Sequence, residues 1–367
     1  RGTGRRPPRS AMNETALLLT GGLLATDDAK TAHGLVRGPS RFRLLGVVDE
    51  AQAGRDAGEV LDGRRRDLPC FDTLESALVA VGRPDWLVVG VAVRGGQLPP
   101  AVRRNLLDGI SRGIGAVNGL HQLLEEDPEI AAAASRSGAR LHDVRRVKRF
   151  SELRFWSGEA LELTVPRVAV LGTDCAIGKR TTATFLLDGL RRGGLGVELV
   201  TTGQTGRLQG HRYGFVLDAT PNDFVTGELE GAVLACAREA RPDVILLEGQ
   251  SALRNPSGPC GAELLLAAGA RGVVLQHAPG REFFEGCEEL GIRIPPLADE
   301  IDLVRRYGAE VLGVALNGER LSGEELRRRA AAFERELGLP ISLPLDDGGE
   351  PLLEGVRRFV AAERPSR

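Results

Sequence analysis

The 367-residue sequence lacks the features that mark secreted, membrane-spanning and nucleic-acid-binding proteins. No stretch approaches the roughly 18 uninterrupted apolar residues of a membrane span. A net charge of −2 without a long basic run argues against a nucleic-acid surface. The cysteines are odd in number and never in CxxC spacing, which argues against a zinc site and a disulfide framework: Cys70, Cys175, Cys236, Cys260 and Cys287. We therefore expect a cytoplasmic protein with no metal site that contacts neither nucleic acid nor membrane.

Lysine and methionine are also scarce. The only lysines are Lys30, Lys148 and Lys179, so these positions are candidates for sites that need a compact ammonium group rather than a guanidinium. The only methionine, Met12, follows eleven residues without the apolar segment of a signal peptide. We interpret residues 1–14 as a disordered extension or upstream translated sequence, not as a targeting arm.

Apolar strands alternate with helical segments along the chain, and its length predicts two domains. In the first half, strands are expected at residues 15–20, 44–48, 86–91 and 116–117, and helices at 73–81 and 99–112. Asp49 follows the second strand, as in dinucleotide-binding folds, but the first strand is not followed by GxGxxG. A Rossmann-like parallel-sheet domain over residues 15–150 is predicted, without NAD.

A charged, irregular segment at residues 141–162 contains the predicted junction between the domains. Beyond it, strands are expected at residues 167–171, 197–201, 244–247, 272–275 and 311–316. Helices are expected at residues 179–192, 224–239, 324–337 and 352–363. This series predicts a P-loop NTPase-like, doubly wound α/β domain over residues 151–367.

The strongest motif is a phosphate-binding loop between an apolar strand and a helix. Such a helix N-terminus presents unpaired N–H groups to an anion, and Lys179 can reach phosphate oxygens. Arg180 stands where a standard loop places its magnesium-binding Ser or Thr, so a pyrophosphate that is bound without cleavage is favoured over ATP with Mg²⁺. The predicted binding residues are Gly172, Thr173, Asp174, Cys175, Ala176, Ile177, Gly178, Lys179, Arg180, Thr181 and Thr182.

Further polar residues follow other predicted strands and are expected at the same edge of the sheet. Glu248 occupies the Walker-B position and is a candidate base or water-mediated metal holder, while His277 is the best general base by its intrinsic pKa. Asn317 is interpreted as an adenine reader or a turn residue. Cys175 is a less favoured acyl acceptor. Arginines after these strands are candidate carboxylate clamps: Arg207, Arg212, Arg254 and Arg281.

The first domain carries a smaller polar cluster directly after its first strand. Lys30 and His33 lie in this cluster and are predicted to contact substrate. Helix-entry chemistry alone is the alternative interpretation of the same residues.

Taken in order, the motifs resemble those of the D-glutamate N-acetyltransferase family. They are KTAHGL (30–35), GLHQLL (119–124), GTDCAIGKRTT (172–182), TTGQTG (201–206), LDA with NDF (217–224), LLEGQ (246–250) and QHAPGR (276–281). The resemblance extends from about residue 15 to residue 360. It implies a Rossmann-like domain followed by a P-loop domain, and a homo-oligomer.

The resemblance also implies acetyl transfer from acetyl-CoA to the amino group of a D-amino acid, chiefly D-glutamate, with the phosphate loop holding the CoA pyrophosphate. Catalytic roles are implied for His277, Glu248 and Asp223. Residues at family motif positions predicted to bind substrate are Gly203, Gln204, Asp218 and Gln250. Residues 207–214 and 255–261 depart from the family pattern, so the sequence leaves open an acceptor amino acid other than D-glutamate.

Two other functions are compatible with the same motifs. An ATP- and Mg²⁺-dependent kinase or ligase of the dethiobiotin-synthetase type shares a similar loop, although its Gly-Lys is followed by threonine. A nucleotide-sensing module without catalysis is the third reading, and the dense polar edge of the predicted sheet argues against it.

Overall fold

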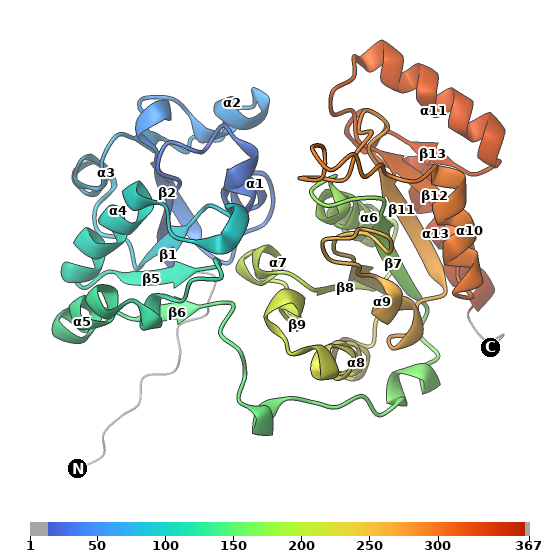
Figure 1. Ribbon diagram of the computed structural model, residues 1–367, viewed down its shortest axis with the longest axis horizontal. Coiled ribbons are helices and arrows are strands. Elements are labelled where there is room, and N and C mark those ends of the chain that lie inside the picture. The colour runs from blue at the N-terminus through green and yellow to red at the C-terminus, as the bar shows by residue number, and fades with distance from the viewer. Residues whose placement is uncertain (1–13, 364–367) are drawn as a thin grey trace. The chain divides into compact units, whose positions relative to one another are not determined.

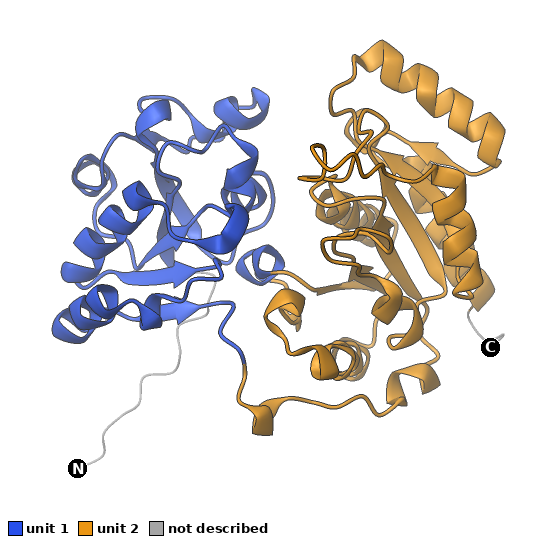
Figure 2. Cartoon of the chain, viewed as in Figure 1, with its two compact units in different colours: residues 1–147, 204–210 blue, residues 148–203, 211–367 orange. Residues whose placement is uncertain are grey.

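The computed structural model describes residues 14–363 and divides into two compact units (Figures 1 and 2). The first unit ends at Val147 and also contains Gln204–Gly210, and the second contains Lys148–Gly203 and the chain from His211 onward. The extension predicted for residues 1–14 lies, except for Glu14, outside the described residues. None of the helices in the described part is long and apolar enough to cross a membrane.

The first unit is a six-stranded parallel sheet in the order β3-β2-β1-β4-β5-β6, the classical order of dinucleotide-binding domains. Apolar clusters cover both faces of this sheet. The strands are β1 (Thr15–Leu19), β2 (Arg43–Val48), β3 (Cys70–Phe71), β4 (Trp86–Val89), β5 (Gly115–Asn118) and β6 (Leu141–Asp143). The helices are α1 (Lys30–Arg37), α2 (Ala57–Asp62), α3 (Leu74–Val81), α4 (Pro100–Ser111) and α5 (Pro128–Ser137).

Asp49, the acid after β2, is fully buried, and its carboxylate makes hydrogen bonds within the protein. Its Oδ2 atom accepts hydrogen bonds from the Thr20 hydroxyl at 2.6 Å and from the Leu24 N–H at 2.9 Å. In nicotinamide-binding proteins the acid at this position forms a hydrogen bond with a ribose hydroxyl. Here the same carboxylate binds the loop after β1.

The second unit is a seven-stranded parallel sheet in the order β13-β12-β11-β7-β10-β8-β9. Its strands are β7 (Arg167–Gly172), β8 (Val197–Thr201), β9 (Tyr213–Gly214), β10 (Val244–Glu248), β11 (Gly272–His277), β12 (Glu310–Leu316) and β13 (Ile341–Ser342). The helices are α6 (Lys179–Arg192), α7 (Gln204–Leu208), α8 (Asn222–Ala240), α9 (Ala262–Leu266), α10 (Leu297–Arg306), α11 (Gly323–Leu337), α12 (Pro344–Asp347) and α13 (Glu350–Glu363), of which α7 belongs to the first unit. One apolar cluster packs α6 and α13 against the sheet, and a second packs the helices α8, α9, α10 and α11 against it.

Both units thus confirm the predicted fold class of two parallel α/β sheets. The prediction that residues 141–162 are irregular is wrong at its start, because Leu141–Asp143 form β6. The rest of this segment packs on α8, where the buried carboxylates of Glu228 and Glu230 accept hydrogen bonds from the backbone N–H groups of Arg154 and Ser157 at 2.9 and 2.7 Å. These buried acids anchor the stretch to α8 through its backbone.

The short helix α7 follows β8 in the chain but packs into the first unit. Leu208 is buried in an apolar cluster of that unit, and the Gln209 amide donates a hydrogen bond to the Gly34 carbonyl at 2.9 Å. The backbone therefore passes between the units at residues 147/148, 203/204 and 210/211.

Candidate functional site

The phosphate loop connects β7 to α6 and is held in a shape that costs conformational energy. Ala176 has a φ of +52° and Gly178 a φ of +105°, and Ser251, on the facing loop, has a φ of +43°. Such left-handed conformations are unfavourable for residues other than glycine and cluster at functional sites. The loop is therefore kept in its shape by the contacts around it.

Lys179 is the first residue of α6 and points back into the loop. Its Nζ atom donates hydrogen bonds to the carbonyls of Asp174 at 2.5 Å and Ser251 at 2.8 Å. Burial lowers the pKa of this ammonium to about 8. Lys179 therefore ties the loop together and carries a positive charge that can pair with a bound anion.

A second cation supports the loop from outside. Arg281, on the loop after β11, donates hydrogen bonds to Asp174 Oδ2 at 3.0 Å and to the Cys175 carbonyl at 2.9 Å. Asp174, which is fully buried, also accepts from the Asn255 amide at 3.1 Å and from the Glu285 N–H at 2.9 Å. The sequence offered Arg281 as a carboxylate clamp, and the carboxylates it holds belong to the protein itself.

Arg180 and Glu248 form the central ion pair of the site. Arg180 Nε donates to Glu248 Oε1 at 2.8 Å, and the two side chains are 28% and 3% exposed. The other carboxylate oxygen, Oε2, is buried and has no hydrogen-bond partner among the described residues. A guanidinium thus lies against the Walker-B acid, where magnesium-dependent loops place their metal.

The two loop threonines do not replace the missing magnesium ligand. Thr182 donates its hydroxyl proton to Gln276 Oε1 at 2.5 Å, and Thr181 is exposed on the helix surface. Asn317 donates to the Ile177 carbonyl at 2.8 Å and accepts from the Glu319 N–H at 2.9 Å. Its amide therefore braces the phosphate loop, and its side-chain oxygen forms the turn that the sequence offered as the alternative to adenine recognition.

The predicted residues after β8 are divided between the two units. Thr202 and Gly203 remain in the second unit, where the Thr202 hydroxyl donates to the Glu248 carbonyl at 2.8 Å and the Gln250 amide donates to the Thr202 carbonyl. Gln204 belongs to the first unit, where its Oε1 accepts from Arg145 at 3.1 Å. Gly203 and Gln250 thus lie beside Glu248.

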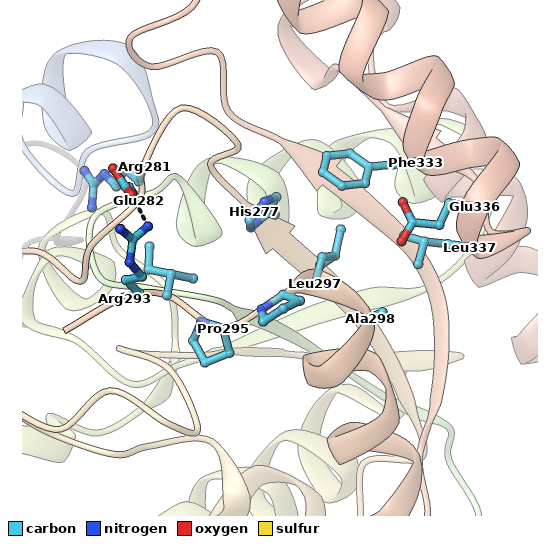
Figure 3. A pocket seen from close by; sticks show the side chains of 12 residues that line it. His277, Arg281, Glu282, Arg293, Pro295, Leu297, Ala298, Phe333, Glu336 and Leu337 are labelled. Carbon is cyan, nitrogen blue, oxygen red and sulfur yellow. Dashed lines mark hydrogen bonds and ion pairs between the residues drawn. The ribbon is translucent and has the colours of Figure 1, made fainter. Parts of the chain in front are cut away.

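His277 ends β11 and connects the phosphate loop to a cavity of about 280 Å³ (Figure 3). Its Nδ1 lies 2.9 Å from the Thr173 hydroxyl, and its ring meets Phe333 edge-on with centroids 5.7 Å apart. Burial, with a smaller contribution from Arg329, lowers the pKa of His277 to about 4. The imidazole is therefore neutral at pH 7, with Nδ1 engaged by the loop.

The remaining predicted residues belong to other elements of the two units. Asp218 and Asp223 are exposed, before and in the first turn of α8. Lys30 and His33 are in α1 of the first unit, where His33 Nε2 lies 2.7 Å from the Leu24 carbonyl and burial lowers its pKa. Two predicted arginine clamps bind acids of the protein, Arg254 with Glu300 at 2.6 Å and Arg212 with Glu239 at 2.5 Å.

Sequence reasoning missed several residues that shape the site. Asn255 and Gln276 are buried amides that fix the phosphate loop and its helix. His211 lies close enough to Glu248 and Arg180 for their charges to act on it, while burial lowers its pKa. Asn255 and His211 are in the two segments that depart from the family pattern, and that departure was the only sequence signal they gave.

Comparison with known proteins was made at the level of families, sequences and structures. Residues 154–353 match the family model described as a domain of unknown function (DUF1611_C), P-loop domain, and residues 50–147 match the DUF1611_N Rossmann-like domain. A DUF1611 family protein from Anabaena variabilis, known from its crystal structure, superposes with a TM-score of 0.85 at 30% identity, over 94% of this chain and 100% of that chain.

Two curated proteins are similar in sequence, and both are named D-glutamate N-acetyltransferase. The protein from Tritonibacter scottomollicae is 29% identical over 77% of this chain and 84% of its own length. The protein from a Pseudoalteromonas species is 27% identical over 72% of this chain and 79% of its own length. The resemblance inferred from the ordered motifs therefore extends to sequence similarity over 72–77% of this chain.

Proposed function

This chain belongs to the DUF1611 family, and from that premise we propose that it is an amino-acid N-acetyltransferase that uses acetyl-CoA. The names of the two curated relatives make D-glutamate the first acceptor to test. In this proposal the phosphate loop holds the pyrophosphate of CoA, and the chemistry takes place beside Glu248.

The observation that carries the proposal is the Arg180–Glu248 ion pair at 2.8 Å. Phosphoryl transfer relies on a metal ion to neutralise the charge that develops on the phosphates. Here a fixed guanidinium lies against the acid that would help to hold that metal. Such a site favours a ligand whose pyrophosphate is gripped and left intact.

The residues of the loop fit a pyrophosphate. The N-terminus of the 14-residue helix α6 supplies unpaired N–H groups and the positive end of a helix dipole. Among the described residues, two backbone carbonyls accept hydrogen bonds from Lys179 Nζ, and it can exchange them for phosphate oxygens. The carboxylate of Asp174 is neutralised by Arg281 and therefore does not repel the ligand.

Acetyl-CoA supplies the acyl group as a thioester, which an unprotonated amine attacks at the carbonyl carbon. The acceptor ammonium first gives one proton to a base; the N–C bond then forms and the C–S bond breaks. The second proton of the amine is lost, the sulfur leaves as the CoA thiol, and one proton is released overall. We assign the base to Glu248, because burial lowers the pKa of His277 to about 4, which makes its imidazole a weak base, and Nδ1 is bound to Thr173.

The experiment is an acetyl-transfer assay of the full chain with acetyl-CoA and a panel of D- and L-amino acids, with EDTA or with Mg²⁺. Release of CoA thiol and the mass of the N-acetyl product are followed together. The proposal requires transfer that EDTA leaves unchanged. Hydrolysis of ATP that needs Mg²⁺, without acetyl transfer to any amino acid, would instead establish the kinase or ligase alternative.

A further inference from the structure

The acid at the centre of the site has one oxygen that the protein leaves without a partner. Glu248 is 3% exposed, and its Oε2 receives no hydrogen bond from the described residues, although Oε1 is bound by Arg180. A buried polar atom left without a hydrogen-bond partner is destabilising, because it has lost its hydration and gained nothing in return. This oxygen therefore favours a ligand that brings a hydrogen-bond donor.

Arg180, which is bound to the same carboxylate, offers hydrogen-bond donors instead of an acceptor. The ion pair uses Nε, and the two Nη atoms donate no hydrogen bond to any of the described residues. A guanidinium presents its five N–H groups in one rigid plane, so the Nη edge can bind a carboxylate while Nε keeps Glu248. Donors and an acceptor are thus presented together.

Gly203 lies beside Nη2 and carries no side chain there. Gly203 has a φ outside the positive range, so its backbone does not require glycine. A methyl group built there would lie 3.2 Å from the Gln250 amide nitrogen and 3.9 Å from Arg180 Nη2. The missing side chain therefore leaves room next to the guanidinium.

We infer that this niche binds the α-amino carboxylate end of the acceptor, with the carboxylate on the Nη edge of Arg180 and the ammonium on Glu248 Oε2. The inference rests on the proposed function and adds which atoms select the acceptor. A phosphate fits worse, because it is an anion without a donor and Glu248 repels it. An amine without a neighbouring carboxylate leaves the Nη atoms unpaired.

An ammonium bound in this way contacts Glu248, the residue that we assign as the base. Oε2 first takes one proton from the ammonium, which frees the nitrogen lone pair to attack the thioester carbon. As the C–S bond breaks, the nitrogen loses its second proton and the sulfur leaves as the CoA thiol, so that one proton is released overall. Arg180 is thus a specificity-determining residue, and Glu248 both binds and deprotonates the acceptor.

The test compares three acceptors that differ in one group. D-Glutamate is the reference, D-isoglutamine has its α-carboxylate replaced by an amide, and D-glutamine has only its side-chain carboxylate replaced. We expect the wild type to lose at least tenfold in kcat/KM with the α-amide compared with D-glutamine. Arg180→Lys keeps the positive charge beside Glu248 but loses the planar pair of Nη donors. It should reduce the preference for D-glutamine over D-isoglutamine by at least fivefold and leave the KM for acetyl-CoA unchanged.

Two further variants keep the test decisive if Arg180→Lys folds poorly. Gly203→Ala, whose φ suits alanine and whose Cβ would press on the Gln250 amide at 3.2 Å, should raise the acceptor KM severalfold and leave the acetyl-CoA KM unchanged. Arg191→Lys, at an exposed arginine in the last turn of the same helix, is the matched control and should change neither. An unchanged preference in Arg180→Lys, or a rise in the acetyl-CoA KM alone, would overturn the inference while acetyl transfer stands.

If no acceptor is acetylated, the proposed function fails, and direct binding decides the inference. Calorimetric titration of the wild type with D-glutamate and D-isoglutamine, without acetyl-CoA, should show binding of the first and at least tenfold weaker binding of the second. Equal affinities, or no binding of either compound, would reject the niche as an amino-acid site.

Discussion

Arg281 donates a hydrogen bond to Asp174 across 3.0 Å inside the wall of the phosphate loop, and the two side chains are 7% and 0% exposed. A carboxylate in an anion-binding loop repels the ligand unless a cation neutralises it. The same guanidinium also binds Glu319 at 2.7 Å, so it links the loops that follow β7, β11 and β12. Arg281 therefore sets both the charge and the shape of the loop.

Replacing Arg281 by methionine should destabilise the fold, because Asp174 would remain buried without its cation. Removal of one partner from a buried pair costs about 3–5 kcal/mol, and we expect a loss in this range in the free energy of unfolding measured with urea. Arg293→Met is the control, because Arg293 and its partner Glu282 are 67% and 56% exposed. That change should cost under about 1 kcal/mol, and equal losses in the two variants would contradict the structural role of Arg281.

Acetyl-CoA binding should weaken as the pH rises above about 8, because burial lowers the pKa of Lys179 to about 8. Below this pH Lys179 is cationic and attracts the pyrophosphate, whereas above it the free protein must take up a proton to bind. Calorimetry between pH 7.5 and 9.5 should show Kd rising up to tenfold for each pH unit above the pKa. Lys179→Arg keeps its charge throughout this range, so its weaker binding should be nearly independent of pH. A flat wild-type profile would show that Lys179 does not pair with the ligand.

The interior of each sheet could be predicted from the sequence, but its edges could not. The central strands are runs of four to seven mostly buried apolar residues, such as Trp86–Val89 and Glu310–Leu316, and all were expected. The four edge strands, Cys70–Phe71, Leu141–Asp143, Tyr213–Gly214 and Ile341–Ser342, were all missed. Two or three residues paired on one side carry no readable periodicity.

The site follows the same division between local and long-range information. The phosphate loop is local, because β7, the loop and α6 are consecutive, and its residues were read directly from the sequence. The bond from Arg281 to Asp174 spans 107 positions and the bond from Asn317 to the Ile177 carbonyl spans 140. Only the paired sheet brings such residues together, so the roles of Arg281 and Asn317 as supports of the loop could not be foreseen.

His277 should make the fold sensitive to acid. Its pKa is lowered from 6.5 to about 4 by burial, so between these values the unfolded chain binds a proton that the folded chain does not. Its contribution to stability is complete above pH 6.5 and is lost as the pH falls towards 4. We expect His277→Asn to reduce the loss of unfolding free energy between pH 6.5 and 5 by about 1–2 kcal/mol. His121→Asn, at an exposed histidine, is the control, and an equal acid dependence in all three proteins would refute the assignment.

Replacing Arg180 by threonine should make the stability of the protein depend on magnesium. The change leaves Glu248 buried without its cation and places a hydroxyl where standard loops bind Mg²⁺. Because Arg180 is partly exposed, we expect a loss of about 1–3 kcal/mol in metal-free buffer. Millimolar MgCl2 should recover part of this loss as a rise in Tm, whereas the wild-type Tm should not respond. The double variant Arg180→Thr with Glu248→Gln removes the charge that attracts the ion and should also not respond. A magnesium response in the wild type, or its absence in Arg180→Thr, would show that the guanidinium does not stand in for a metal ion.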